Sequence, residues 1–231
     1  MRLAVIPARG GSTRIPRKNI RVFVDRPIIA YSIEAALTSG LFDKVIVSTD
    51  DEEIASVARA LGAEVPFIRP AALADDYVGT NPVVAHAIHW FREQGHIIEH
   101  ACCIYSTAPF IRSEYLTEGW RRLNESGQSF AFSVTTYPYP IQRSLRMRAD
   151  GIMEVMYPED FKKRSQDLEE AYHDAGQFYW GRADAFGTVA LHQNSVPVIL
   201  PRWLVQDIDT PEDWATAELM YRAMQLDVEH A

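Results

Sequence analysis

The sequence predicts an α/β fold in which a mainly parallel, mixed sheet is flanked by helices. Short apolar runs alternate with stretches whose apolar residues recur at helical spacing, as in βαβ units. The 231 residues are 47% hydrophobic and 23% charged, a balance typical of globular domains and not of disordered chains or disulfide scaffolds. A loop with paired glycines and several cations follows the first expected strand, where α/β folds bind ligands. We therefore expect one ligand-binding domain over residues 1–231.

The first half of the chain alternates strand-like and helix-like segments. Runs rich in β-branched and small apolar residues predict strands, and apolar residues spaced as Ile29, Ile33 and Leu37 predict helices. Gly62 is typical of the position after a helix C-terminus. The expected strands are Leu3–Ile6, Lys44–Ser48, Glu64–Ile68, Ala101–Tyr105 and Phe130–Thr135. The expected helices are Ile28–Ser39, Asp50–Leu61, Pro82–Gln94 and Ser113–Asn124.

The regular alternation stops after Thr135. The prolines of Tyr137-Pro138-Tyr139-Pro140 exclude a central strand or a helix interior. A β-hairpin is expected from Leu145–Arg148 and Ile152–Met156 around a turn with glycine, so residues 137–172 read as a small insertion beside the main sheet. The remaining expected elements are a strand at Gln177–Trp180, a helix near Arg182–Val189, a strand at Pro197–Leu200 and a terminal helix from Pro211.

Charge and cysteine content narrow the functional classes. The formal net charge of −8 argues against a protein that coats nucleic acid. No apolar run approaches the ~18 residues that a membrane span needs, and the N-terminus does not resemble a signal peptide. Cys102 and Cys103 are adjacent in an apolar run, so on a strand they point to opposite faces and suit burial better than a disulfide. A cytoplasmic protein is expected.

The most informative segment is the loop from Ala8 to Asn19, Ala-Arg-Gly-Gly-Ser-Thr-Arg-Ile-Pro-Arg-Lys-Asn. Glycines allow close approach of the backbone to a ligand, and arginine and lysine bind phosphate oxygens. Polyphosphate binding is the functional interpretation, and a solvated basic turn is the structural alternative. The loop matches neither the P-loop pattern nor the dinucleotide pattern Gly-x-Gly-x-x-Gly.

A second candidate site lies near the C-terminus. In an extended Val205–Asp209 segment, Asp207 and Asp209 project to one face and Ile208 to the other. Paired carboxylates are hard oxygen ligands that suit Mg²⁺. The alternative, helix capping, is assigned to the following residues, with Thr210 as the N-cap and Asp213 three residues later. The basic loop and the carboxylate pair together predict an enzyme that uses a nucleotide and magnesium.

The opening segment Ile6-Pro7-Ala8-Arg9-Gly10-Gly11-Ser12-x-Arg14-Ile15-Pro16-x-Lys18-Asn19 resembles the first motif of the acylneuraminate cytidylyltransferases, which make CMP-activated nonulosonic acids. The similarity continues in order over nearly the whole chain, at Val47-Ser48-Thr49-Asp50, Ile68-Arg69-Pro70, Leu73-Ala74-Asp75-Asp76 and Asp207-Ile208-Asp209-Thr210. Within the family, Ala101-Cys102-Cys103-Ile104-Tyr105, Ser165-Gln166-Asp167-Leu168 and Tyr172-His173-Asp174-Ala175-Gly176 resemble the pseudaminic acid branch.

The resemblance implies a Rossmann-like nucleotidyltransferase fold and a homodimer in which the insertion packs against the partner. It implies the Mg²⁺-dependent reaction of CTP with pseudaminic acid to give CMP-pseudaminic acid and pyrophosphate. The implied catalytic residues are Arg9, Lys18, Asp207 and Asp209, the last two as metal ligands. The implied nucleotide-binding residues are Arg9, Gly10, Gly11, Ser12, Arg14, Lys18, Asn19, Arg69, Asp76 and Thr80. The implied sugar-binding residues are Tyr105, Thr107, His173, Asp174, Gln177 and Tyr179.

Other readings stay open at this point. CMP-sialic acid and CMP-legionaminic acid synthetases are alternatives within the family, although the sialic acid branch usually has Gln-Pro-Thr-Ser-Pro where this chain has Tyr105-Ser106-Thr107-Ala108-Pro109. The 3-deoxy-octulosonate branch usually has Asp-Glu-Pro at the last three of these positions. From other classes, a dinucleotide oxidoreductase lacks its glycine fingerprint, and a non-catalytic nucleotide-binding protein does not need Asp207 and Asp209. His173 is a candidate general base by its ordinary pKa of ~6.5, but a lone histidine is more often structural, so His173 is not assigned as catalytic.

Overall fold

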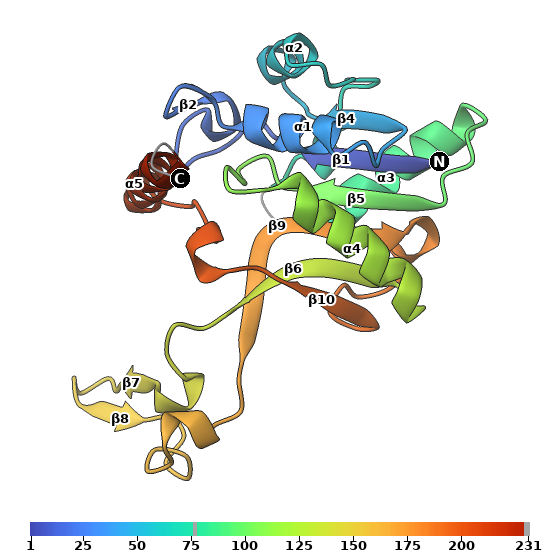
Figure 1. Ribbon diagram of the computed structural model, residues 1–231. Helices are drawn as coiled ribbons and strands as arrows, with labels where there is room; N and C mark the ends of the chain where they lie inside the picture. The colour runs from blue at the N-terminus through green and yellow to red at the C-terminus, as the bar shows by residue number, and fades with distance from the viewer. Residues whose placement is uncertain (76–77, 229–231) are drawn as a thin grey trace.

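A mixed sheet of six strands, in the order β10-β6-β9-β5-β1-β4, forms the centre of the computed structural model (Figure 1). The structure describes residues 1–75 and 78–228. Parallel pairs join β1 to β4 and β5, and β10 to β6, whereas β9 runs antiparallel to both of its neighbours. The sheet strands are β1 (Arg2–Pro7), β4 (Lys44–Ser48), β5 (His100–Ile104), β6 (Phe130–Thr136), β9 (Tyr172–Arg182) and β10 (Ser195–Ile199). The expected α/β fold with a mixed, mainly parallel sheet is confirmed.

Helices cover both faces of the sheet. On one face, α1 (Ile29–Thr38), α2 (Glu52–Ala60) and α4 (Ser113–Ser126) bury their apolar sides, and on the other lies α3 (Thr80–Glu93). The neighbouring side chains of Cys102 and Cys103 are free thiols that belong to the two different core clusters, as the alternation of a buried strand requires. The terminal helix α5 (Pro211–Val228) forms a third apolar cluster with the segment that contains the ribbon β2 (Val22–Phe23) and β3 (Arg26–Pro27).

Two expected elements are wrong. The segment Glu64–Ile68 makes two isolated bridges, from Glu64 to Ile46 in β4 and from Ile68 to Thr49 just after β4, because Pro66 lacks the N–H that a continuous ladder needs. In place of a helix at Arg182–Val189 there is a single 3₁₀ turn, Ala183–Ala185, which is followed by Gly187 with a positive φ of 83°. The expected strand at Gln177–Trp180 is the middle of the much longer β9.

The connection from β6 to β9 projects away from the body of the molecule (Figure 1). It contains the antiparallel hairpin of β7 (Leu145–Met147) and β8 (Met153–Val155), the hairpin that the sequence predicts. We call residues 137–171 the arm. Short 3₁₀ turns occur at Lys18–Ile20, Ala71–Leu73, Ile141–Arg143, Ser165–Asp167 and Arg202–Leu204. No helix in the described ranges is long and apolar enough to cross a membrane.

Candidate active site

A cleft of about 360 Å³ opens at the carboxyl ends of β1 and β5, beside the N-terminus of α3. This is the edge of the sheet at which parallel α/β folds collect ligand-binding loops. Ten of the residues that the sequence singles out line the cleft: Arg9, Ser12, Arg14, Lys18, Asn19, Arg69, Thr80, Tyr105, Thr107 and Asp209. They come from five separate segments of the chain, which the fold brings together. Asp76 lies outside the described residues.

The basic loop after β1 is held by its own polar contacts. The amide of Asn19 is buried, donating from Nδ2 to the carbonyl of Arg9 at 2.8 Å and accepting at Oδ1 from the hydroxyl of Ser106 at 2.8 Å. Asn19 therefore connects the start of the loop, its end and the segment after β5. Both ends of its amide are engaged by protein groups, so Asn19 shapes the wall of the cleft.

Gly10 is required by packing against the protein. A Cβ atom at Gly10 would lie 2.7 Å from Oδ2 of Asp51, closer than real Cβ contacts, and the Gly10 N–H donates to Oδ1 of Asp50 at 3.0 Å. At Gly11, by contrast, a Cβ would meet nothing within 4 Å. The missing side chain of Gly10 thus lets the backbone of the basic loop pack closely against the segment after β4.

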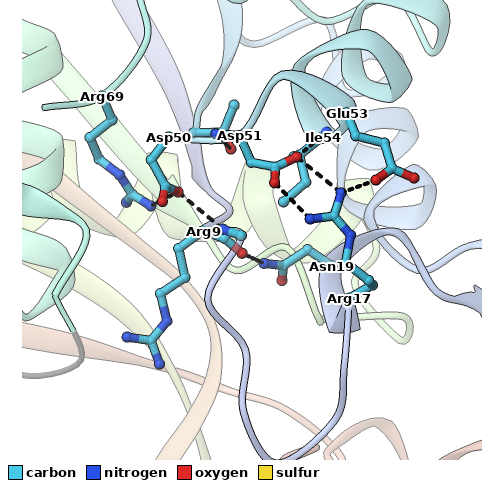
Figure 2. A network of polar contacts seen from close by, with 10 residues as sticks. Arg9, Arg17, Asn19, Asp50, Asp51, Glu53, Ile54 and Arg69 are labelled. Carbon is cyan, nitrogen blue, oxygen red and sulfur yellow. Dashed lines mark hydrogen bonds and ion pairs between the residues drawn. The ribbon is translucent and has the colours of Figure 1, made fainter. Parts of the chain in front are cut away.

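Three of the four loop cations, Arg9, Arg14 and Lys18, line the cleft, and the fourth faces away from it. Arg17 has a left-handed backbone conformation, with φ 55°, and binds Asp51 through two hydrogen bonds of 2.6 and 3.0 Å. It also pairs with Glu53. Figure 2 shows this cluster, with the Arg9 side chain extending away from it. Arg17 attaches the loop to the start of α2 and leaves the remaining cations to the cleft.

Asp209 also lines the cleft and contacts two of these cations. Its Oδ1 lies 3.0 Å from Nη2 of Arg14 and 3.3 Å from Nζ of Lys18, which also donates to the carbonyl of Ile208 at 2.6 Å. Ile208 is buried in the third apolar cluster, so the carboxylates on either side of it face outward, as the alternation predicts. Asp207 lies outside the cleft lining, and partial desolvation together with Asp209 raises its pKa.

The capping prediction for the terminal helix is confirmed. The Thr210 hydroxyl accepts from the N–H of Asp213 at 3.2 Å, and the Asp213 carboxylate accepts from the Thr210 N–H at 2.7 Å. This reciprocal capping box fixes the start of α5. A third bond, from the Asp209 N–H to Asp213 at 3.1 Å, holds the backbone at the cleft. Asp213 therefore has a structural role, and the carboxylates of Asp207 and Asp209 are not used for capping.

Two carboxylates suit a magnesium ion that completes its shell with other oxygens. Mg²⁺ in phosphoryl-transfer sites is typically held by one or two carboxylates plus phosphate oxygens and water. Within residues 1–75 and 78–228 no group of three or more acidic, histidine or cysteine side chains suits a metal. The donor chemistry of Asp207 and Asp209 therefore fits an ion that arrives with a phosphate ligand. The raised pKa of Asp207, which Asp209 contributes to, means that an added cation would relieve repulsion there.

On the expected sugar side, only Tyr105 and Thr107 line the cleft. Behind them, the Tyr179 hydroxyl donates to the Asp174 carboxylate at 2.8 Å, and its ring centroid lies 5.3 Å from that of Tyr105. Asp174 also accepts from the Gly176 N–H at 2.8 Å. Burial and the nearby Tyr105 raise the pKa of Tyr179, so its hydroxyl stays protonated and keeps donating. Asp174 and Tyr179 thus support Tyr105 from behind.

The other two expected sugar residues lie farther from the cleft. Gln177 is buried, and its Nε2 donates to the carbonyl of Leu204 at 2.5 Å, which joins β9 to the turn before Asp207. His173 stands at the root of the arm, with its ring centroid 4.8 Å from that of Tyr137. Sequence reasoning did not select Asp51 as a contact of the loop or Ser106 as a partner of Asn19, because both contacts join segments far apart in the chain.

Comparisons with known proteins agree with this architecture. A sequence model of the family described as Cytidylyltransferase matches residues 3–185. The chain is 44% identical over 222 residues to the pseudaminic acid cytidylyltransferase of Campylobacter jejuni, covering 95% of this chain and 96% of the relative. It is 31% identical to the CMP-N,N'-diacetyllegionaminic acid synthase of Legionella pneumophila, covering 96% and 97%.

Among solved structures, CMP:2-keto-3-deoxy-manno-octonic acid synthetase complexed with CTP superposes with a TM-score of 0.69 at 16% identity, over 96% of this chain and 99% of that one. At this identity the likeness concerns the fold.

Proposed function

The chain belongs to the cytidylyltransferase family, and we propose that it transfers CMP from CTP to pseudaminic acid and releases pyrophosphate. The observation that carries the proposal is the cleft at the edge of the sheet, which three cations of one loop line and where two of them, Arg14 and Lys18, contact the Asp209 carboxylate. Such a site matches a ligand with a triphosphate chain and an accompanying cation. The 44% identity with a pseudaminic acid cytidylyltransferase supports the choice of sugar.

The loop cations have the electrostatic role in this reaction. The anomeric hydroxyl of the sugar attacks the α-phosphorus in line, a new O–P bond forms as the bond to pyrophosphate breaks, and the hydroxyl proton is lost. Negative charge develops on the phosphate oxygens, and Arg9, Arg14 and Lys18 offer donors that are already placed around the cleft. Holding the two reactants in one orientation lowers the barrier further.

Asp207 and Asp209 are the residues that we propose as ligands for Mg²⁺. The ion, when bound, supplies Lewis acidity and neutralises charge on the phosphate oxygens. Asp209 pairs with Arg14 and Lys18. Binding of a triphosphate would give those cations phosphate oxygens as new partners, leaving the carboxylate for the metal.

We propose that Tyr105 contributes to the choice of sugar. Its ring lines the cleft and is supported by Tyr179, which Asp174 in turn fixes by a hydrogen bond. Pseudaminic acid ends in a deoxy methyl group, which an aromatic side chain contacts well, while the glycerol hydroxyls of sialic acid would be poorly paired there. Stranding buried hydroxyl groups is an effective means of rejecting a substrate. Legionaminic acid is a competing substrate, because a 31% identical relative is named for it.

We further propose that the protein is a homodimer whose arm packs against a second copy. The arm carries apolar side chains that are largely exposed in the single chain: Tyr139, Met147, Ile152, Met153 and Phe161. A concentration of exposed apolar surface marks an interaction site. Light scattering of wild type and Met147→Asp should give a dimer and a monomer, respectively, whereas two equal masses would refute the role of the arm.

We also propose a cytoplasmic location, since the cysteines are free and the reaction consumes CTP.

A pyrophosphate-release assay tests the function. The protein is given CTP, UTP, ATP or GTP with each of pseudaminic, legionaminic and sialic acid, with magnesium or with a chelator. We expect turnover with CTP and pseudaminic acid, loss of turnover with the chelator, and the highest kcat/KM for pseudaminic acid. Equal or higher values for sialic acid would refute the sugar assignment, and indifference to the nucleotide would refute the cytidylyltransferase reaction itself.

A further inference from the structure

Two adjacent carboxylates after β4 contact different partners. Asp51 binds Arg17 and also accepts from the N–H of Ile54 at 2.9 Å as the N-cap of α2. Asp50 faces Gly10 and Arg69 instead: its Oδ1 accepts from the Gly10 N–H at 3.0 Å and lies 3.5 Å from Nη2 of Arg69 (Figure 2). One oxygen of Asp50 therefore lies between the basic loop and Arg69.

Arg69 is an unusual cation because it is buried and two of its guanidinium nitrogens have no hydrogen-bond partner among the described residues. The residue is only 5% exposed, it lines the cleft, and its Nε and Nη2 atoms have no hydrogen-bond partner within residues 1–75 and 78–228. An unpaired charge of this kind is costly to bury. Burial lowers the pKa of Arg69, and the Asp50 carboxylate opposes this effect. At 3.5 Å the Asp50 carboxylate compensates the charge of Arg69 at the edge of hydrogen-bond distance.

The backbone fixes the two residues in register. The Arg69 N–H donates to the carbonyl of Thr49 at 2.7 Å, and Ile68 forms a parallel bridge with Thr49. Because Thr49 precedes Asp50 and Ile68 precedes Arg69, this bridge sets the two side chains beside each other. The backbone determines where the Arg69 side chain starts, and the carboxylate of Asp50 is the charged group next to its far end.

We propose that Asp50 is a positioning residue for nucleotide binding, holding the guanidinium of Arg69 in the cleft while fixing the basic loop through Gly10. The proposal rests on the proposed function, since CTP is the ligand that Arg69 would meet. Asp50 touches no substrate and acts through two neighbours. The effect of its charge on CTP binding therefore depends on the presence of Arg69, whereas the effect of Asp51, which holds Arg17 and α2, does not.

The test is a double-mutant cycle measured by pyrophosphate release. Asp50→Asn keeps an oxygen for the Gly10 N–H and removes only the charge, and Arg69→Met keeps most of the apolar stem. We expect Asp50→Asn to raise the KM for CTP roughly tenfold, a loss in the range of one charge-assisted contact, with kcat and the KM for the sugar within about twofold of wild type. In the Arg69→Met background the same substitution should change the KM for CTP by less than about twofold.

Asp51→Asn is the matched control. It weakens the Arg17 contact and the cap of α2, so it should lower the thermal midpoint and change the KM for CTP by the same factor with either residue at position 69. If Asp50→Asn does not fold, Asp50→Ser retains a small acceptor for the loop and enters the same cycle.

If the effects of Asp50→Asn and Arg69→Met on the KM for CTP multiply in the double mutant, the two residues act independently. That result, obtained with an active wild-type enzyme, would overturn the proposal. A wild-type protein that does not use CTP would overturn the proposed function and this inference with it.

Discussion

Replacing Gly10 by alanine should strain the basic loop at one identifiable contact. The new Cβ would lie 2.7 Å from Oδ2 and 3.0 Å from Cβ of Asp51. Asp51 cannot easily retreat, because Arg17 holds it at 2.6 and 3.0 Å and the Ile54 N–H holds it at 2.9 Å. Overpacking of this kind costs about 1–3 kcal/mol, and the lower chain entropy of unfolded alanine returns about 0.4–1 kcal/mol. We expect a net destabilisation of about 1–2 kcal/mol.

The chain contains the control for this substitution in the next residue. A Cβ at Gly11 meets nothing within 4 Å, and its φ is not in the left-handed region, so Gly11→Ala should leave the free energy of unfolding unchanged or raise it slightly. Urea unfolding gives both values, and heating should show a midpoint about 2–8 °C lower for Gly10→Ala. The loop must also move away from Asp50, so the KM for CTP should rise in this variant. Equal stability of the two alanine variants would refute the packing argument.

Three further outcomes follow from the same geometry. Asp209→Asn keeps the shape of the side chain but removes the charge proposed to hold Mg²⁺, so turnover should fall at least about 100-fold at limiting magnesium while circular dichroism stays native; near wild-type activity would exclude the metal role. Lys18→Ala should weaken CTP use by about 1.5–3 kcal/mol in kcat/KM and leave the sugar KM nearly unchanged; a change in the sugar KM alone would reassign the loop. Hydrogen bonds from Arg17 lower the pKa of Asp51 to about 2, so its ionised form stabilises the fold above the unfolded pKa of ~3.9 and that contribution is lost as the pH falls toward 2; the stability difference between wild type and Asp51→Asn should therefore shrink over that range, and a constant difference would contradict the assignment.

The sequence is sufficient for the architecture because the strands and helices carry local signals. The run Lys44–Ser48 is a strand at the predicted bounds, and Thr210 and Asp213 cap the terminal helix as their types and spacing predict. The two failures also have local causes, Pro66 and the left-handed Gly187. The structure of segments that contain such residues depends on tertiary contacts, which the periodicity of apolar residues does not reveal.

The details of the candidate site do not follow from the sequence in the same way, because membership of a motif does not say which way a side chain points. Arg17 belongs to the same basic run as Lys18, yet its left-handed backbone turns it toward Asp51 and Glu53, away from the cleft. Gln177 belongs to the residues expected to bind the sugar, yet its side chain is buried and donates to the carbonyl of Leu204. Such assignments depend on pairs separated by about 30 residues or more in the chain, which a single sequence does not specify.

The position of β9 affects how the chain is synthesised. This strand separates β5 from β6 in the finished sheet, although it follows both in the chain and comes only after the arm. While the ribosome makes residues 105–171, the edge of β5 that will receive β9 has no partner, and open strand edges are templates for aggregation. Translation at ~5–20 residues per second leaves that edge open for several seconds. The nascent chain therefore exposes an unpaired strand edge until β9 is made, and this edge is where it is prone to pair with other chains.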